Sequence, residues 1–363
     1  MRSICALLLT AALLLGAAVP VCALPSESPP AVPLSAHSAA LILADTGELI
    51  YEKNADEPMG MASTTKLMTA LVVAERCDPE RIVSIPAEAV GIEGSSVYLT
   101  KGERLTVKEL LYALLLSSAN DASVALALTV SSSVEEFCAL MNQRARELGL
   151  SQTHFVNPHG LYHREHYTTA RELAILASAV LAVPLLRQIV STKKISISLD
   201  GRPDQRLLVN HNRLLSSYEG ALGMKTGYTK KTGRALVSAA ERNGLTLIAV
   251  TLNAPDDWMD HELLLDYGFA NYEMVTLAEA GTFRYPMPLA GGTSDWILLT
   301  NGISVKMALP RKRGPITYRI DATSPFLFAP QARNRRVATL TYFCQGRSVS
   351  SPLYTLTAAE GKP

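Results

Sequence analysis

The sequence predicts an α+β protein in which an antiparallel sheet flanked by helices is followed by a small all-β domain. Two hairpins frame the first domain, over residues 38–52 and 233–252, with Asp-Thr-Gly and Asn-Gly as their turns. Short apolar runs on both sides of such a turn are typical of paired strands. Between the hairpins the apolar residues recur with helical spacing, and after Tyr272 only short strand-like runs follow. This order is typical of an α+β or mixed domain with a separate β unit behind it.

The helices of the first domain are predicted from apolar periodicity and from signals at their ends. They cover residues 63–75, 107–116, 122–130, 134–148 and 169–181. Thr106 and Glu109 form a capping-box pattern at the start of the second helix. Gly149 and Pro184 are expected to mark the ends of the last two.

Shorter elements complete the first domain. Strands are expected at residues 82–85 and 96–99, and strand patterns return from Ile195. A last helix is expected over residues 259–267, ending at Gly268. His261, near the start of that helix, is predicted to lie on the surface.

The domain organisation follows from composition. Residues 1–23 have a basic start, an apolar run and small residues before Ala23, which is typical of a secretory signal peptide. Residues 24–36 form a Pro- and Ser-rich linker, 37–275 the main domain and 276–363 the C-terminal β domain. We expect an exported protein. An uncleaved membrane anchor at residues 1–23 is the alternative, although the run is short for a span.

Net charge and cysteine content narrow the function classes. A formal charge of +1 over 363 residues gives no electrostatic basis for binding nucleic acid or an anionic membrane. Three cysteines remain after the signal peptide, too few and too scattered for a disulfide framework or a Cys-x-x-Cys metal site. One of them, Cys138, lies in an apolar helical pattern and is predicted to be in the core.

Ser63 and Lys66 open an apolar run three residues apart, so they share one face of the predicted helix. A serine at a helix start lies near the positive end of the helix dipole, which favours developing negative charge. An amine at that distance can take the hydroxyl proton if burial lowers its pKa enough to keep it neutral. The alternative is an N-capping serine with an unrelated lysine, so this pair alone does not identify a nucleophile.

Two further polar motifs interrupt apolar segments downstream. Ser118 and Asn120 break two apolar helices, where buried polar groups need partners, although an ordinary helix–helix turn also favours these residues. Lys225, Thr226 and Gly227 lie on a predicted strand. They offer a cation and a hydroxyl donor to a substrate carboxylate, and the glycine admits a substrate backbone. The alternative for Lys225 is a solvated lysine on an edge strand.

Together the three motifs form the set used by penicillin-recognising serine acyltransferases. The sequence resembles the serine-type D-alanyl-D-alanine carboxypeptidases, the low-molecular-mass penicillin-binding proteins of peptidase family S11. Further matching stretches are residues 94–99, 110–122, 155–161, 210–215 and 263–269. The resemblance is close over residues 36–272 and weaker beyond. It implies a β-lactamase/transpeptidase-like fold with a helical subdomain, and we expect no cofactor and no metal.

The resemblance implies catalytic roles for three residues and a substrate-binding role for Asn120. Ser63 is expected to form an acyl-enzyme with the penultimate D-alanine of a peptidoglycan stem peptide, releasing the terminal D-alanine. Lys66 is expected to act as the general base, and Ser118 to relay the proton to the leaving amine. Asn120 is expected to hold Lys66 and the substrate amide in place.

The resemblance also implies how substrate is bound. Lys225 and Thr226 are expected to bind the terminal carboxylate, with Gly227 allowing close approach. The backbone N–H groups of Ser63 and Tyr228 are expected to form the oxyanion hole, and β-lactam antibiotics are the expected inhibitors. A second Lys-Thr-Gly triplet begins at Lys231, in the turn after the first, and is expected to be solvated.

Several alternatives stay open. The same residues could hydrolyse peptide cross-links as a DD-endopeptidase, and an inactive wall-binding or penicillin-sensing protein could keep the fold. A class A β-lactamase is disfavoured because no Glu-x-x-Leu-Asn pattern follows Ser118. His159, His163 and His166 share one loop, but no carboxylate set completes a metal site. Residues 356–363 are too short and polar for an amphipathic membrane helix, so no C-terminal anchor is expected.

Overall fold

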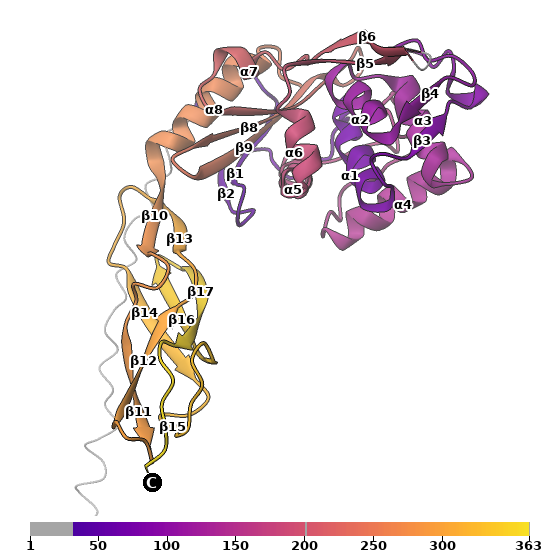
Figure 1. Cartoon of the computed structure of the whole chain (residues 1–363). Helices are drawn as coiled ribbons and strands as arrows, with labels where there is room; N and C mark the ends of the chain where they lie inside the picture. The colour runs from indigo at the N-terminus through magenta and orange to yellow at the C-terminus, as the bar shows by residue number, and fades with distance from the viewer. Residues whose placement is uncertain (1–31, 200–201, 363) are drawn as a thin grey trace, which may run out of the picture. The chain divides into compact units, whose positions relative to one another are not determined.

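The computed structural model of the protein describes residues 32–199 and 202–362 (Figure 1). The expected signal peptide and most of the expected linker lie outside the described residues. The described end of that linker packs on the first domain: Leu34 and Ala36 are buried, and the Ser35 hydroxyl donates to Asp260 at 2.8 Å. The fold is α+β, as predicted, while the boundaries placed at residues 36 and 275 stay predictions.

A five-stranded antiparallel sheet forms the centre of the first domain. Its order is β2-β1-β9-β8-β7, with β1 Ser38–Leu43, β2 Leu49–Lys53, β7 Ala221–Thr229, β8 Gly233–Arg242 and β9 Leu245–Leu252. Both predicted hairpins are confirmed, since β1 pairs with β2 and β8 with β9. Asn243 and Gly244 turn between β8 and β9 with φ of 51° and 80°, which suits a two-residue turn. β7 is an edge strand, so one side of it is available to a substrate.

The helices follow the predicted order. They are η1 Ala62–Thr65, α1 Lys66–Arg76, η2 Ala87–Ala89, α2 Val107–Leu116, α3 Asn120–Val130, α4 Val134–Glu147, α5 Ala170–Ala182, α6 Pro184–Val190, α7 Leu214–Ser217 and α8 Asp257–Asn271. α1 to α4 gather in one helical subdomain (Figure 1). α1 is central to it, because every residue from Lys66 to Val73 is buried. The capping box of Thr106 and Glu109 is confirmed at the start of α2, and Cys138 is buried in the core as predicted.

The strand expected at residues 96–99 was a wrong prediction. The segment is irregular, and Tyr98 has a φ of +57°. The backbone N–H groups of this segment do not pair with any neighbouring strand that the structure describes. Those of Val97 and Leu99 donate to the buried carboxylate of Asp121, at 3.2 and 3.0 Å. The strand expected at residues 82–85 is found as β3 Ile82–Ser84, which pairs with β4 Arg104–Thr106, and a second small hairpin joins β5 Lys194–Leu199 to β6 Arg202–Val209.

One helix-end prediction and one burial prediction were wrong, whereas the helix end expected near Pro184 was found. α5 ends at Ala182, and Pro184 then opens α6, because a proline at the first helical position loses no hydrogen bond. α8 continues through Gly268 to Asn271, and a side chain at Gly268 would meet Leu247 at 2.4 Å. His261 is fully buried rather than exposed, and its Nε2 lies 2.9 Å from the Thr251 hydroxyl.

The C-terminal region is all β, as predicted. It contains β10 Tyr272–Ala278, β11 Tyr285–Ala290, β12 Trp296–Asn301, β13 Val305–Pro310, β14 Thr317–Ala322, β15 Leu327–Phe328, β16 Arg336–Cys344 and β17 Arg347–Thr355. Six strands form a sheet in the order β14-β16-β17-β12-β11-β15, and β10 pairs with β13. A core of its own, which includes Leu299, Leu340 and Leu353, holds these strands together.

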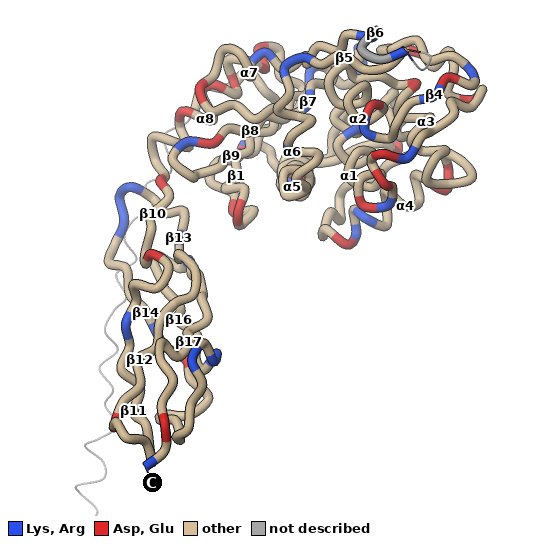
Figure 2. The backbone as a smooth tube through the Cα atoms, in the orientation of Figure 1, with Lys and Arg blue, Asp and Glu red and all other residues tan. Residues whose placement is uncertain are grey.

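Charged residues are spread along both regions rather than gathered in one (Figure 2). This distribution matches the near-zero net charge of the chain. No single helix within residues 32–199 and 202–362 has both the length and the apolar character to cross a membrane. Two helix pairs, each sharply bent at its break, would suffice by length and composition alone.

Candidate active site

Ser63 lies in η1, the short 3₁₀ turn that leads directly into α1. It is half-buried, whereas the residues around it are buried. The adjacent edge strand β7 approaches so closely that a Cβ on Gly227 would lie 3.0 Å from the backbone nitrogen of Ser63. The Ser63 N–H is therefore next to the backbone of β7, as an oxyanion hole shared with Tyr228 requires.

Lys66 is fully buried in the first turn of α1, and its Nζ has three polar neighbours. They are the Ser63 Oγ at 3.1 Å, the Asn120 Oδ1 at 2.7 Å and the backbone oxygen of His159 at 2.6 Å. Burial, reinforced by the charge of Lys225, holds the pKa of Lys66 well below its ordinary range. The site therefore favours a neutral amine beside the serine.

The neighbours of Lys66 determine where the lone pair of a neutral amine would point. Asn120 donates through Nδ2 to the backbone oxygen of Glu93, which fixes its Oδ1 toward Lys66 as an acceptor. The His159 carbonyl is also only an acceptor. These two oxygens use both N–H bonds of the neutral amine. The lone pair is then left for the hydroxyl proton of Ser63, which is the arrangement of a general base.

Ser118 lies between α2 and α3 with a φ of +58°, and it is almost fully buried. It lines the same cleft as Ser63. Among the described residues, its hydroxyl makes no hydrogen bond with Ser63 or Lys66. The structure thus brings Ser118 to the predicted site without a direct contact to the nucleophile.

The predicted substrate-binding residues follow one another along β7. Lys225 is buried, and its Nζ donates to the backbone oxygen of Thr226 at 2.8 Å. Burial lowers the pKa of Lys225 to about 7. Thr226, Gly227 and Tyr228 line the cleft, and the Tyr228 side chain is exposed.

The cleft has a volume of about 580 Å³, and part of its lining was missed by the sequence analysis. Arg234, Asp257 and Trp258 were not singled out at all, and Ser95, Asn210, His211 and Arg213 lay only within stretches that carried the resemblance. No local signal marks Arg234 or Trp258, because the register of β8 and the start of α8 bring them to the cleft.

The loop that supplies the His159 carbonyl is organised by Asn157. Its Oδ1 accepts from the N–H groups of His159 and Gly160, at 3.3 and 2.7 Å, and its Nδ2 donates to the backbone oxygen of Leu161. A Cβ on Gly160 would lie 1.9 Å from the backbone oxygen of Ala62, so only glycine fits against the turn of the nucleophile.

His166 ties the same loop to the start of α1. Its Nδ1 accepts from the Val156 N–H at 3.1 Å, and its Nε2 lies 2.7 Å from the Thr65 hydroxyl. Burial lowers the pKa of His166 to about 3, which keeps the ring neutral. In residues 32–199 and 202–362, no three His, Cys, Asp or Glu side chains are placed to hold a metal ion. The structure instead gives His166 the task of holding the loop against α1.

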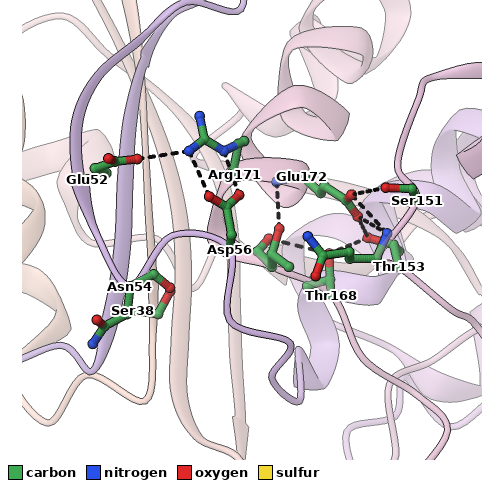
Figure 3. A network of polar contacts seen from close by, with 11 residues as sticks. Ser38, Glu52, Asn54, Asp56, Ser151, Thr153, Thr168, Arg171 and Glu172 are labelled. Carbon is green, nitrogen blue, oxygen red and sulfur yellow. Dashed lines mark hydrogen bonds and ion pairs between the residues drawn. The ribbon is translucent and has the colours of Figure 1, made fainter.

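The base of this loop is held by side chains of α5 (Figure 3). Glu172 accepts from the Thr153 hydroxyl at 2.5 Å, and the Thr153 and Thr168 hydroxyls lie 2.7 Å apart. The neighbouring Arg171 pairs with Asp56 at 2.6 Å and with Glu52 of β2 at 2.8 Å. The carbonyl that faces Lys66 therefore belongs to a segment whose ends are tied to each other and to α5, and α5 in turn pairs with β2.

Comparison with known proteins gives a consistent result. The peptidase S11 family, D-alanyl-D-alanine carboxypeptidase, matches residues 25–256. D-alanyl-D-alanine carboxypeptidase DacF of Bacillus subtilis is 36% identical over 77% of this chain and 73% of its own length. DacC of Escherichia coli is 33% identical over 90% of this chain and 85% of its own. The crystal structure of penicillin binding protein 5 from Haemophilus influenzae superposes with a TM-score of 0.72 at 27% identity, covering 92% of this chain and 99% of that one.

Proposed function

The chain belongs to the D-alanyl-D-alanine carboxypeptidase family, peptidase S11, and is a serine-type D-Ala-D-Ala carboxypeptidase; we propose that Ser63 is its nucleophile. The observation that carries this proposal is the environment of the Lys66 amine, which is buried and lies 3.1 Å from the Ser63 hydroxyl. Two fixed oxygen acceptors leave its lone pair for that hydroxyl. A weakly acidic hydroxyl becomes an effective nucleophile only beside such a base.

Acylation follows from this arrangement. Ser63 Oγ bonds to the carbonyl carbon of the penultimate D-alanine while its proton passes to Lys66. The backbone N–H groups of Ser63 and Tyr228 stabilise the oxyanion, a contribution of about 10²- to 10³-fold per donor in comparable sites. The C–N bond then breaks, and the leaving amine of the terminal D-alanine takes a proton relayed through Ser118.

Deacylation reuses the same base. A water molecule attacks the ester carbonyl carbon and gives its proton to Lys66, and the bond to Ser63 Oγ breaks as the oxygen regains a proton. Asn120 is hydrogen-bonded to Lys66, and in this proposal it holds both the amine and the substrate amide. Lys225 and Thr226 bind the terminal carboxylate in this proposal, and Gly227 lets the substrate backbone lie against β7.

The substrate in this proposal is the pentapeptide stem of peptidoglycan, and penicillins acylate the same serine. Such a substrate requires that the enzyme act outside the cytoplasm, in the periplasm or at the cell wall. Cleavage of peptide cross-links is the second candidate, because the cleft of about 580 Å³ is also lined by residues without a role in this mechanism, among them Arg213 and Trp258.

Labelled penicillin tests the proposal directly. The mature protein is expected to carry the label on Ser63, located by peptide mapping, and Ser63→Ala is expected to carry none. A pentapeptide stem should then yield free D-alanine, while a cross-linked dimer distinguishes endopeptidase from carboxypeptidase action. Label on any other residue would contradict the proposed nucleophile, and label without D-alanine release would favour a penicillin-sensing role.

A further inference from the structure

The mechanism above leaves one wall of the cleft without a task. Arg213, Arg234, Asp257 and Trp258 all line the same cavity as Ser63 and Thr226. They come from the segment before α7, the start of β8 and the start of α8. The wall carries two arginines in a site whose proposed substrate ends in a carboxylate. The question is which cation faces that carboxylate.

The register of β7 and β8 places Arg234 on the same face as the substrate-binding hydroxyl. Arg234 pairs with Tyr228, and residues paired across antiparallel strands share a face, as does Thr226 two residues earlier. Lys225 pairs with Val237, whose side chain belongs to the core shared with α1. Lys225 is thus on the opposite face of the sheet, whereas Arg234 shares the face of Thr226 and Tyr228.

The two cations also differ in how much charge they offer. Lys225 is 1% exposed, its Nζ already donates to the Thr226 carbonyl, and burial lowers its pKa to about 7. The side chain of Arg234 is 52% exposed, and a guanidinium stays charged at any relevant pH. Its one ion pair within the described part of the chain is with Asp257 at 3.8 Å, too long for a hydrogen bond. Arg234 therefore keeps its donors for a ligand.

The surrounding charges favour an anion next to Arg234. The guanidinium of Arg213 stacks over the Trp258 ring, 5.7 Å from its centroid, so this second arginine is already engaged. Asp257 is buried below Arg234, and burial raises its pKa although Arg234 acts to lower it. Lys225 and the two arginines outnumber this single carboxylate, whereas burial lowers the pKa of His211 and favours its neutral ring. An incoming carboxylate therefore meets a net positive wall.

We propose that Arg234 is the permanently charged receptor for the terminal carboxylate of the substrate, and that it selects peptides with a free carboxyl terminus. This inference rests on the function proposed above. The planar guanidinium can bind a carboxylate through two parallel N–H···O bonds, a geometry that the ammonium group of a lysine does not provide. Thr226 adds a hydroxyl donor on the same face, and Lys225 acts from the opposite face.

This assignment is tested by removing the terminal carboxylate from the substrate and, separately, the guanidinium from position 234. Two peptides are compared, one ending in D-Ala-D-Ala with a free carboxylate and one ending in the carboxamide. For Arg234→Gln, kcat/KM on the carboxylate peptide is expected to fall about 10- to 100-fold, the range for one hydrogen-bonded charge. The value on the carboxamide is expected to stay within about two-fold, because no anion is present to lose its partner.

Penicillin and its methyl ester provide a second measurement that also reports folding. Acylation of Ser63 by the ester is expected to be equal in wild-type and Arg234→Gln, while acylation by the free acid slows in the variant. If wild-type Ser63 is not acylated at all, the proposed nucleophile is wrong. If both proteins are acylated equally by both compounds, the nucleophile is confirmed and the role of Arg234 is refuted.

Lys231→Gln is the matched control, since it removes one positive charge from the exposed turn between β7 and β8. It is expected to leave the preference for carboxylate over carboxamide unchanged. Arg234→Lys, which keeps the charge but loses the paired N–H bonds, should restore part of the preference. Equal losses on carboxylate and carboxamide peptides in Arg234→Gln would show a structural effect and would overturn the proposal.

Discussion

The cleft has two walls, each with a buried lysine in different surroundings. The helical wall is formed by η1, α1 and the turn before α3, and the strand wall by β7 and the start of β8. On the helical wall, the amine of Lys66 lies between Ser63, Asn120 and the His159 carbonyl, groups that come from three separate segments. On the strand wall, the amine of Lys225 donates, among the residues that the structure describes, only to the carbonyl of the next residue. Both are buried, yet only Lys66 is enclosed by groups that define a direction for its lone pair.

This difference suits Lys66 to proton transfer and Lys225 to substrate binding. A group that transfers a proton needs fixed partners, because small displacements raise the barrier steeply. A group that attracts a carboxylate needs charge and space, and the strand wall has both in Lys225 and Arg234. The helical wall is therefore expected to determine kcat and the strand wall KM, and variants on each wall can break this division.

The largest effect is expected on the helical wall from Lys66→Arg. A guanidinium remains protonated, so it has no lone pair for the Ser63 hydroxyl. The rate of Ser63 acylation by labelled penicillin should fall by about 10³-fold, within the range for loss of a general base. A rate within ten-fold of wild type would show that Lys66 does not act as the base.

The next effect distinguishes the two Lys-Thr-Gly triplets. Lys225→Ala removes the buried cation of β7 and should lower kcat/KM for D-alanine release by about 100-fold. Lys231→Ala, in the exposed turn, should stay within about two-fold because a solvated charge contributes little. The reverse result would mean that the second triplet, and not the first, binds substrate.

Local signals in the sequence predicted much of the fold. The Asn243–Gly244 turn and the capping box at Thr106 depend on neighbouring residues only, and both were found. Residues 96–99 and His261 were mispredicted because long-range partners determine them. The Asp121 carboxylate accepts hydrogen bonds from backbone N–H groups of residues 96–99. The packing of α8 against β9 buries His261.

The site divides in the same way. Ser63, Lys66, Lys225 and their motif partners are recognisable because their spacing is fixed within single elements. Arg234 is not, because its place beside Thr226 depends on the pairing of β8 with β7, and its neighbour Asp257 comes from α8. The turn at Lys231 indicates that the two strands follow each other, but nothing in the sequence near position 234 indicates the register of their pairing.

A smaller effect is expected from loosening the loop that faces Lys66. Asn157→Ala removes the acceptor for the N–H groups of His159 and Gly160, so the His159 carbonyl is no longer fixed. We expect kcat to fall about 10-fold with KM little changed, since a misplaced partner slows the chemical step. Asn142→Ala, which frees Phe155 at the other end of the loop, is the matched control and should mainly lower thermal stability. Equal losses of kcat in both variants would indicate general loosening instead.

The smallest effect is a pH dependence of KM that separates the two cations of the strand wall. The pKa of Lys225 is lowered to about 7, so this lysine is charged below that pH and loses its charge above it. Arg234 stays charged throughout. In the wild type, KM for a carboxylate peptide should rise only about three-fold across one pH unit on either side of that pKa. In Arg234→Gln the rise should be steeper, about ten-fold, because Lys225 is then the main cation left to bind the carboxylate. A KM that does not change with pH in either protein would show that Lys225 contributes no titrating charge to binding, and the strand wall would then depend on Arg234 alone.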